Sequence, residues 1–290
     1  MITKAGTLSA LRGGRGLSPR EELPVKRIPC VILIFVFLIL GSSSALAGGY
    51  SSAIDSVWSS FSSGNRSANS APQQLTNGTY RTFEFAYIWA QELDTRGRYS
   101  STLDSIWSSY QSGNRTANSA PQQAVNGTYR TVEALQVVAT LLDTSGRYST
   151  AISSVMSSFS SGNRSASSAP QQIVNGTYRT VEMLQIIATL LDTRGAYTSS
   201  ISSVVSSFNS GNRSANSAPQ QIANGTYRTF ELLYIIGQIM DTRGIYSSSM
   251  DSIWSSYQSG NRSANSAVQQ QLNGSYRSVE MLYIITSLLD

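Results

Sequence analysis

The amino-acid sequence predicts an all-α protein made of tandem helical hairpins that stack as an α-solenoid. The first observation is an internal repeat, because five copies of one 49-residue unit begin at Tyr50, Tyr99, Tyr148, Tyr197 and Tyr246. The second is a helical period: the apolar residues of each unit recur every three or four residues and do not alternate as in a strand. A repeat of this length is typical of solenoid proteins, whose neighbouring units bury a shared core that a single unit lacks.

The chain is predicted to consist of a leader, residues 1–47, and a single repeat domain, residues 48–290. The leader has the order of a Sec-type signal peptide: Lys26 and Arg27 precede the apolar run 28–40, and Ala45-Leu46-Ala47 follows. Cleavage is expected near Ala47–Gly48, which predicts a secreted or cell-envelope protein. The repeats within the domain are 50–98, 99–147, 148–196, 197–245 and 246–290.

The apolar run is shorter than the roughly 20 residues of a bilayer-spanning helix. No membrane span is therefore expected after cleavage, and an uncleaved anchor is the alternative. Four of the five units of net positive charge lie in the same leader. Six of the 21 basic residues and two of the 16 acidic residues lie before Gly48, so the rest of the chain carries 15 arginines, 14 acidic residues and a net charge of +1. This balance lacks the basic footprint of a nucleic-acid-binding domain.

The repeat domain has no cysteine, histidine or lysine, because Cys30, Lys4 and Lys26 all lie in the leader and the chain has no histidine. Disulfides are therefore excluded, and packing alone must hold an exported chain together. The same absences exclude a thiolate nucleophile, an imidazole base, a Schiff-base amine and a soft metal site. We expect no cofactor and no metal.

The first part of each unit predicts an amphipathic helix. In the third unit Tyr148, Ile152, Val155, Met156 and Phe159 are spaced 4, 3, 1 and 3, which places them on one helical face. Serines occupy the other face. Serine is a poor helix former, so this helix must be stabilised by docking its apolar stripe. The segment 161–163 (Ser-Gly-Asn) is predicted to end it, with the glycine in a left-handed conformation.

A capping box follows, with Ser168 as N-cap, proline in the first turn and Gln171 reaching back. It predicts a short helical stretch over 169–174 that is broken at Asn175-Gly176. The last helix is then expected to begin near Thr177 or Thr180 and to run to Thr193, before Gly195.

This last helix is apolar nearly all round, so it is predicted to be the inner helix, with the serine-faced helix outside it. The chain closes with Leu288 and Leu289 and has no polar capping helix after them. Either the array closes into an α/α toroid or another chain covers its end. An open right-handed superhelix is the favoured arrangement, and it allows end-to-end self-association.

One line along the inner helix is polar. Tyr178, Glu182, Gln185 and Thr189 are spaced 4, 3 and 4, so they share one side. We call this line and its equivalents the polar seam. Stacked seams would form a ladder of aromatic, carboxylate and amide groups that suits an extended glycan or peptide. The alternative is structural, with Arg179 paired to Glu182 and Tyr178 packed at the repeat junction. The candidate binding residues are Tyr80, Glu84, Tyr87, Tyr129, Glu133, Gln136, Tyr178, Glu182, Gln185, Tyr227, Glu231, Tyr234, Tyr276, Glu280 and Tyr283.

Two further motifs recur in each unit. The first is Gly-Asn-Arg, interpreted as a turn whose arginine, such as Arg164, reaches a carboxylate such as Asp192. The second is Asn-x-Ser/Thr, which in a eukaryotic or archaeal secretory route would mark exposed glycosylation sites. The alternative is that the triplets carry no such meaning, as in a bacterium, and that their Asn-Gly members form turns. Its asparagines are Asn65, Asn77, Asn114, Asn126, Asn163, Asn175, Asn212, Asn224, Asn261 and Asn273.

Catalysis is not expected. Glu182 and Asp192 lie about 15 Å apart along one helix at 1.5 Å per residue, whereas a glycosidase pair needs roughly 5–10 Å. A carboxylate pair between neighbouring repeats leaves a hydrolase as a remote alternative. The sequence therefore predicts a secreted or cell-surface, non-catalytic scaffold that binds an extended glycan, peptide or protein. The alternative is a self-assembling structural component of the cell surface or matrix.

Overall fold

The computed structural model describes residues 49–290, which belong to one compact unit. The predicted signal peptide and its cleavage site lie outside the described residues.

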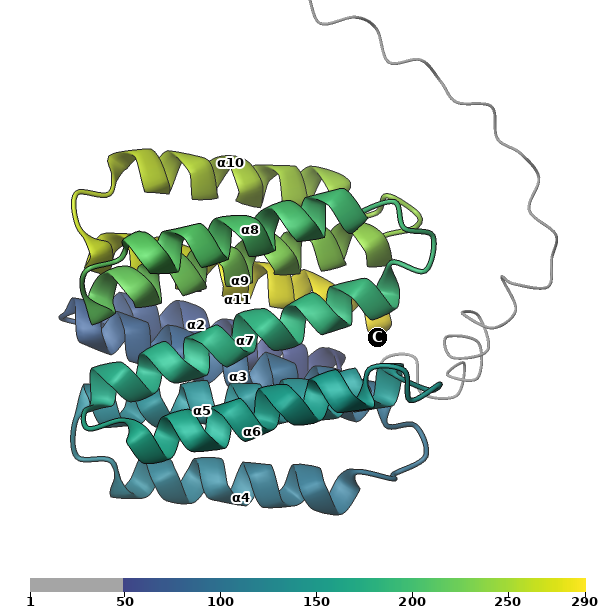
Figure 1. Ribbon diagram of the computed structural model, residues 1–290, viewed down its shortest axis with the longest axis horizontal. Coiled ribbons are helices and arrows are strands. Elements are labelled where there is room, and N and C mark those ends of the chain that lie inside the picture. Colours follow the sequence, from purple (N-terminus) through teal and green to yellow (C-terminus); the bar gives the residue numbers. More distant parts are fainter. Residues whose placement is uncertain (1–48) are drawn as a thin grey trace, which may run out of the picture. The chain divides into compact units, whose positions relative to one another are not determined.

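The described chain is all-α, as predicted, and its ten helices form five pairs (Figure 1). The first helix of each pair has 17 residues and the second has 23. The first helices are α2 (Ser51–Ser67), α4 (Ser100–Thr116), α6 (Ser149–Ser165), α8 (Thr198–Ser214) and α10 (Ser247–Ser263). The second helices are α3 (Ala71–Leu93), α5 (Ala120–Leu142), α7 (Ala169–Leu191), α9 (Ala218–Met240) and α11 (Ala267–Leu289).

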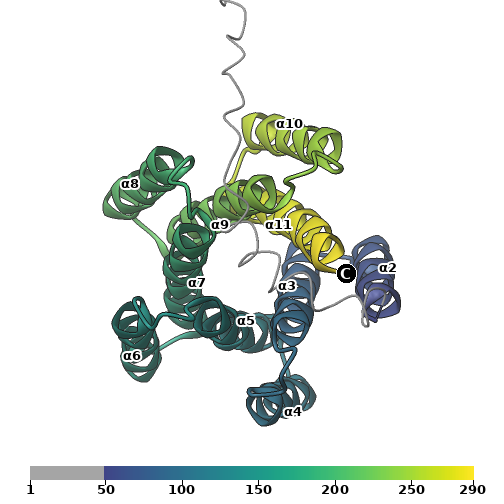
Figure 2. The ribbon, with the colours of Figure 1, turned by 90° about the vertical axis from the view of Figure 1, so that its right-hand side faces the viewer.

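The five long helices form an inner ring, and the five short helices lie outside it (Figure 2). Each long helix packs against the long helix of the next pair, and α11 packs against α3 in the same way. The array is therefore closed. The favoured expectation of an open superhelix is wrong, and the ring alternative is correct.

The closing contact repeats the chemistry of the internal contacts. The backbone N–H of Tyr197 donates to Asp192 Oδ2 at 2.9 Å, and the backbone N–H of Tyr50 donates to Asp290 Oδ1 at 3.0 Å. The ring of Phe61 meets Tyr276 at a centroid distance of 4.6 Å. Leu288 and Leu289 are half-buried within the ring's core. End-to-end association stays a prediction. The apolar end on which it was based packs within the closed ring and is not free.

Burial follows the predicted faces. On α6, Ile152, Val155 and Phe159 are buried while the serines of the opposite face remain accessible. On α9 the consecutive pairs 232–233 and 235–236 are all buried, so the helix is enclosed on several sides. Apolar patterning therefore determines which helix of each pair is inner, because only the long helix can bury such pairs.

The predicted break at Asn175-Gly176 is wrong, and so is the predicted end of α6 at 161–163. Both helices continue because Asn175 of α7 packs against Gly162 of α6 and forms hydrogen bonds to α6. Asn175 Nδ2 donates to the Phe159 carbonyl at 2.9 Å and to Asn163 Oδ1 at 2.7 Å. A Cβ on Gly162 would lie 2.3 Å from Asn175 Oδ1. The glycine thus permits a close helix crossing, and the hydrogen bonds of the asparagine stabilise it.

The start of the inner helix differs in detail from the predicted capping box. Gln171 does reach back, and its Oε1 accepts from the backbone N–H of Ser167 at 2.8 Å. The side chain of Ser168 makes no capping bond. At the other end α7 stops at Leu191, two residues before its predicted limit at Thr193. Gly195 lies in the following turn and has φ of +69°, a left-handed conformation that suits glycine.

Candidate binding grooves

The polar seam faces outward between two outer helices. On α9, Glu231, Tyr234 and Gln238 form the floor of a groove of about 500 Å³ between α8 and α10. Trp254 of α10 lines the groove. The side contributed by α8 consists of Ser199, Ser200, Ser203, Val204 and Ser207. The serine face of an outer helix is therefore one wall of the groove, beside a floor that carries aromatic, amide and carboxylate groups.

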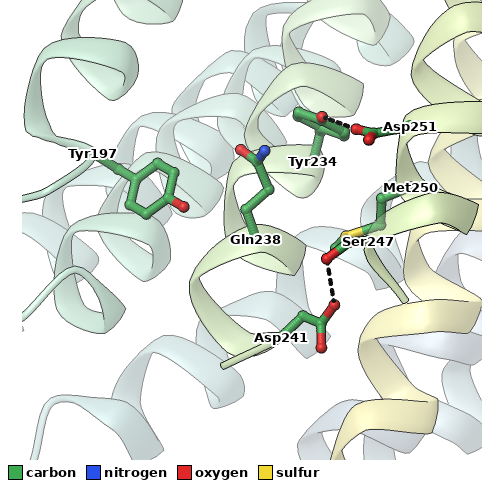
Figure 3. Close-up of a pocket in the computed structure, with 7 residues that line it drawn as sticks. All are labelled: Tyr197, Tyr234, Gln238, Asp241, Ser247, Met250 and Asp251. Atoms are coloured by element: carbon green, nitrogen blue, oxygen red, sulfur yellow. Dashed lines mark hydrogen bonds between the residues drawn. The ribbon is translucent and has the colours of Figure 1, made fainter. Parts of the chain in front are cut away.

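A pocket of about 210 Å³ shares Tyr234 and Gln238 with this groove (Figure 3). In it the Tyr234 hydroxyl donates to Asp251 Oδ1 at 3.1 Å. Burial, reinforced by Asp251, raises the pKa of Tyr234 to about 12. The hydroxyl therefore stays protonated and can only act as a neutral hydrogen-bonding group. The remaining lining residues are Tyr197, Asp241, Ser247 and Met250.

The first residue of each seam is used in packing between repeats. Tyr178 meets Phe208 of the next outer helix edge-on at a centroid distance of 5.1 Å. Burial raises the pKa of Tyr80, Tyr129 and Tyr227 to about 12. The packing of Tyr178 on Phe208 is the repeat-junction contact that the structural alternative predicted. The five tyrosines in this position are Tyr80, Tyr129, Tyr178, Tyr227 and Tyr276.

The second residue of each seam is a glutamate paired with the arginine three residues before it. Arg179 Nη1 lies 2.5 Å from Glu182 Oε2. Burial raises the pKa of Glu84, Glu133 and Glu231, and the arginine opposes that rise. Each pair brings both signs of charge to the floor, so this position adds no net charge. All five glutamates are paired, namely Glu84, Glu133, Glu182, Glu231 and Glu280.

The third residue of each seam varies in chemistry, as does the fourth, which is glutamine, threonine or serine. The third residue is a tyrosine in the first, fourth and fifth repeats, at Tyr87, Tyr234 and Tyr283, and a glutamine in the other two, at Gln136 and Gln185. The three tyrosines contact tryptophans of the next outer helix: Trp107, Trp254 and Trp58. These tryptophans were not among the predicted site residues. Comparing each unit with the one after it, instead of with itself, would have revealed them.

The five seams do not form the continuous ladder that stacking of the repeats suggested. An outer helix packs against the inner helix of its own repeat and against that of the preceding repeat. Figure 2 shows these helices placed between successive inner helices around the ring. Each seam therefore faces its own gap between two outer helices.

The Gly-Asn-Arg motif does not act as predicted. Arg164 is exposed and makes no ion pair among residues 49–290. Asp192 instead accepts from the backbone N–H of Tyr197 and from the Thr198 hydroxyl, so it caps the next outer helix. The asparagines of the Asn-x-Ser/Thr triplets lie within helices, and none is exposed. The expectation of exposed acceptor sites is therefore wrong.

Glu92 breaks the repeat. The other units have an apolar residue at its position, namely Leu141, Leu190, Ile239 and Leu288. Both carboxylate oxygens of Glu92 are buried without a hydrogen-bond partner in the described chain. Burial, reinforced by Asp290, raises the pKa of Glu92 to about 8. This side chain lies near the ring closure, and Glu92 was not among the predicted site residues.

Within the described chain, no group of three or more acidic residues is placed to hold a metal ion. The ten described helices include none with the length and apolar character of a membrane span. Comparisons with protein-family models, curated proteins and solved structures gave no match.

Proposed function

We propose that this protein is a non-catalytic binding scaffold that presents ligand-binding grooves around a closed helical ring. The observation that carries the proposal is the groove between α8 and α10, with Glu231, Tyr234 and Gln238 on its floor. Concave sites that combine aromatic surface with a few fixed polar groups are the usual form of ligand sites. We further propose a secreted or cell-surface location, a proposal that rests on the sequence of the leader alone.

The groove offers hydrogen bonds without an excess of charge. Serine hydroxyls form one wall, and the Gln238 amide and the Tyr234 hydroxyl lie on the floor. Arg228 and Glu231 are paired with each other. These features support binding of a polar, uncharged ligand, such as a glycan or a polar peptide segment.

The test is to fill the grooves without disturbing the core. Ser203 is exposed and lines the groove, whereas Ser206 is exposed and does not. The equivalents of Ser203 are Ser56, Ser105, Ser154 and Ser252, and those of Ser206 are Ser59, Ser108, Ser157 and Ser255. One variant changes all five groove serines to glutamine, and the matched control changes the other five.

Both variants and the unaltered repeat domain, residues 48–290, are then applied to glycan and peptide arrays. We expect binding that the groove variant loses and the control variant retains, with equal helical circular dichroism for all three. Equal binding by both variants would show that the ligand lies elsewhere and would contradict the proposal.

A further inference from the structure

We infer that three of the five repeat junctions are carbohydrate sites and that the other two are not. A junction is the contact between the inner helix of one repeat and the outer helix of the next. The inference rests on the proposed function and names its ligand class and its number of sites. The observation behind it is that the junctions fall into two chemical kinds.

Three junctions carry a tyrosine whose ring packs at a tilt against a tryptophan. The ring centroids of Tyr234 and Trp254 lie 4.6 Å apart with an interplanar angle of 33°. The equivalent values are 4.9 Å and 35° for Tyr87 with Trp107, and 5.1 Å and 40° for Tyr283 with Trp58. All six rings are half-buried, so each pair keeps part of its surface accessible.

Each aromatic pair has an exposed aspartate beside it. Asp251 accepts from the Tyr234 hydroxyl at 3.1 Å, and Asp55 accepts from the Tyr283 hydroxyl at 3.5 Å. Asp104 lies close enough to Tyr87 to help burial raise its pKa. A carboxylate accepts through two oxygens, so one bond to tyrosine leaves further acceptor positions for a ligand.

The other two junctions lack every member of this set. Gln136 is followed in the next outer helix by Ser153 and Met156 where the aromatic junctions have aspartate and tryptophan. Gln185 is followed in the same way by Ser202 and Val205. The three residue types therefore change together, although they come from two different repeats.

A neutral pyranose fits the aromatic junctions better than a peptide does. The ring of a sugar has an apolar C–H face that can lie on tryptophan and tyrosine, and its hydroxyls can donate to aspartate and to the Gln238 amide oxygen. An amphipathic peptide helix requires an apolar groove, but one wall of this groove is mostly serine. A polyanion would meet the exposed Asp251 carboxylate.

The chain contains a built-in reporter for these junctions. It has four tryptophans, and three of them are Trp58, Trp107 and Trp254. The fourth, Trp89, is only 1% exposed and lies in the core. A change of tryptophan fluorescence on ligand addition therefore reports on the aromatic junctions.

The experiment titrates the repeat domain with cellohexaose, maltohexaose and chitohexaose, and follows heat and tryptophan fluorescence. A glycan array identifies a replacement probe if these three fail. We expect three sites per chain, of which the one at Tyr283 has Ser287 in place of the glutamine amide. Trp254→Leu should remove one of them, with a loss of affinity at that site of at least about tenfold, whereas Val205→Leu should leave all three. Melting curves establish that both variants are folded.

A gain-of-function variant tests the assignment from the other side. Gln185→Tyr combined with Ser202→Asp and Val205→Trp copies the aromatic set into a glutamine junction and should create a fourth site. Five sites, or binding unaffected by Trp254→Leu, would overturn the inference while leaving the proposed function intact. Capture of peptides but of no glycan, still blocked by the groove-serine variant, would overturn only the carbohydrate assignment. Failure of both ligand classes overturns both.

Discussion

The contact between Gly162 and Asn175 shows how a single polar pair sets the crossing of two helices. The asparagine donates to the Phe159 carbonyl and to Asn163, and the glycine leaves room for it. Gly162→Ala should destabilise the domain by about 1–3 kcal/mol, because the new methyl group displaces the asparagine from its bonds. Urea denaturation followed by circular dichroism measures the change.

A double-mutant cycle separates this cause from glycine's general effect on helices. In an Asn175→Ala background the methyl group no longer meets the asparagine side chain. Gly162→Ala should then cost nothing, or should stabilise the helix by about 0.5–1 kcal/mol. Additive costs across the cycle would contradict the proposed contact.

Glu92 should make the stability of the domain depend on pH. Its pKa is about 8 in the folded chain, against an ordinary value of 4.5 that the unfolded chain should show. The groups facing it are Asp290, the C-cap of α11, and Tyr50, whose own pKa is raised by burial and by Glu92. Because the folded pKa is the higher one, the protonated form is favoured by folding. Stability should therefore fall as pH rises from about 5 to 8, with a slope approaching about 1.4 kcal/mol per pH unit.

Glu92→Leu should remove this fall and stabilise the domain at pH 8, since the other repeats have leucine or isoleucine there. Glu92→Gln is the matched control. It removes the charge but keeps a buried polar group, so it should flatten the pH profile with a smaller gain at pH 8. Urea midpoints at pH 5, 6.5 and 8 measure both effects. A profile for Glu92→Leu as steep as that of the unaltered domain would refute the assignment.

At the scale of the helix, α11 differs from its four equivalents at its start. It has Val268, 38% exposed, where the others have proline in the first turn. Proline there fixes a helical backbone angle and lacks only an N–H that the first turn leaves unbonded. Val268→Pro should therefore stabilise the domain by about 0.4–1 kcal/mol. Thermal melting compares it with Val268→Ala, which should have little effect, and a lower melting temperature for the proline variant would count against it.

The helices themselves were largely predictable, but their continuation through Gly162 and through Asn175-Gly176 was not. Spacing assigned Ile152, Val155 and Phe159 to one buried face because burial follows the helical period. Asn175-Gly176 was misread as a turn because its local chemistry favours one. The side-chain bonds that keep the helix intact come from another helix, and local sequence signals do not contain that information. The same holds for Gly162.

The closure of the ring was also predictable from the sequence, but only by comparing the inner helix of each repeat with the outer helix of the next. Phe83 and Phe230 of the inner helices pack on Tyr110 and Tyr257 of the next outer helices. Where the inner helix has valine, the next outer helix has phenylalanine. The fifth repeat has Val279, and the first repeat has Phe61. Tyr283 likewise finds Asp55 and Trp58 only when the fifth repeat is followed by the first. The valine–phenylalanine pairing and the tyrosine–aspartate–tryptophan set therefore both hold between the fifth repeat and the first.

Such a ring should tolerate a change in where the chain starts. Asp290 and Tyr50 meet as Asp192 and Tyr197 do, and the internal link between the latter pair is the segment 193–196 (Thr-Arg-Gly-Ala). A permuted chain can run from Tyr197 to Asp290, through a copy of that segment, and then from Tyr50 to Asp192. It replaces one link by another of the same kind, so its free energy of unfolding should change by only about 1 kcal/mol.

The matched control carries the same added link but opens the chain between Gly225 and Thr226, within α9. It severs an inner helix, so it should lose several kcal/mol or fail to fold. Light scattering and urea denaturation compare the two. A monomeric first permutant with native helicity is expected, because every junction of the ring is then made within one chain. A dimer would mean that the third and fourth repeats, which the permutant no longer joins, pair between chains as readily as within one. The covalent order of the repeats, not their junctions alone, would then maintain the closed monomer.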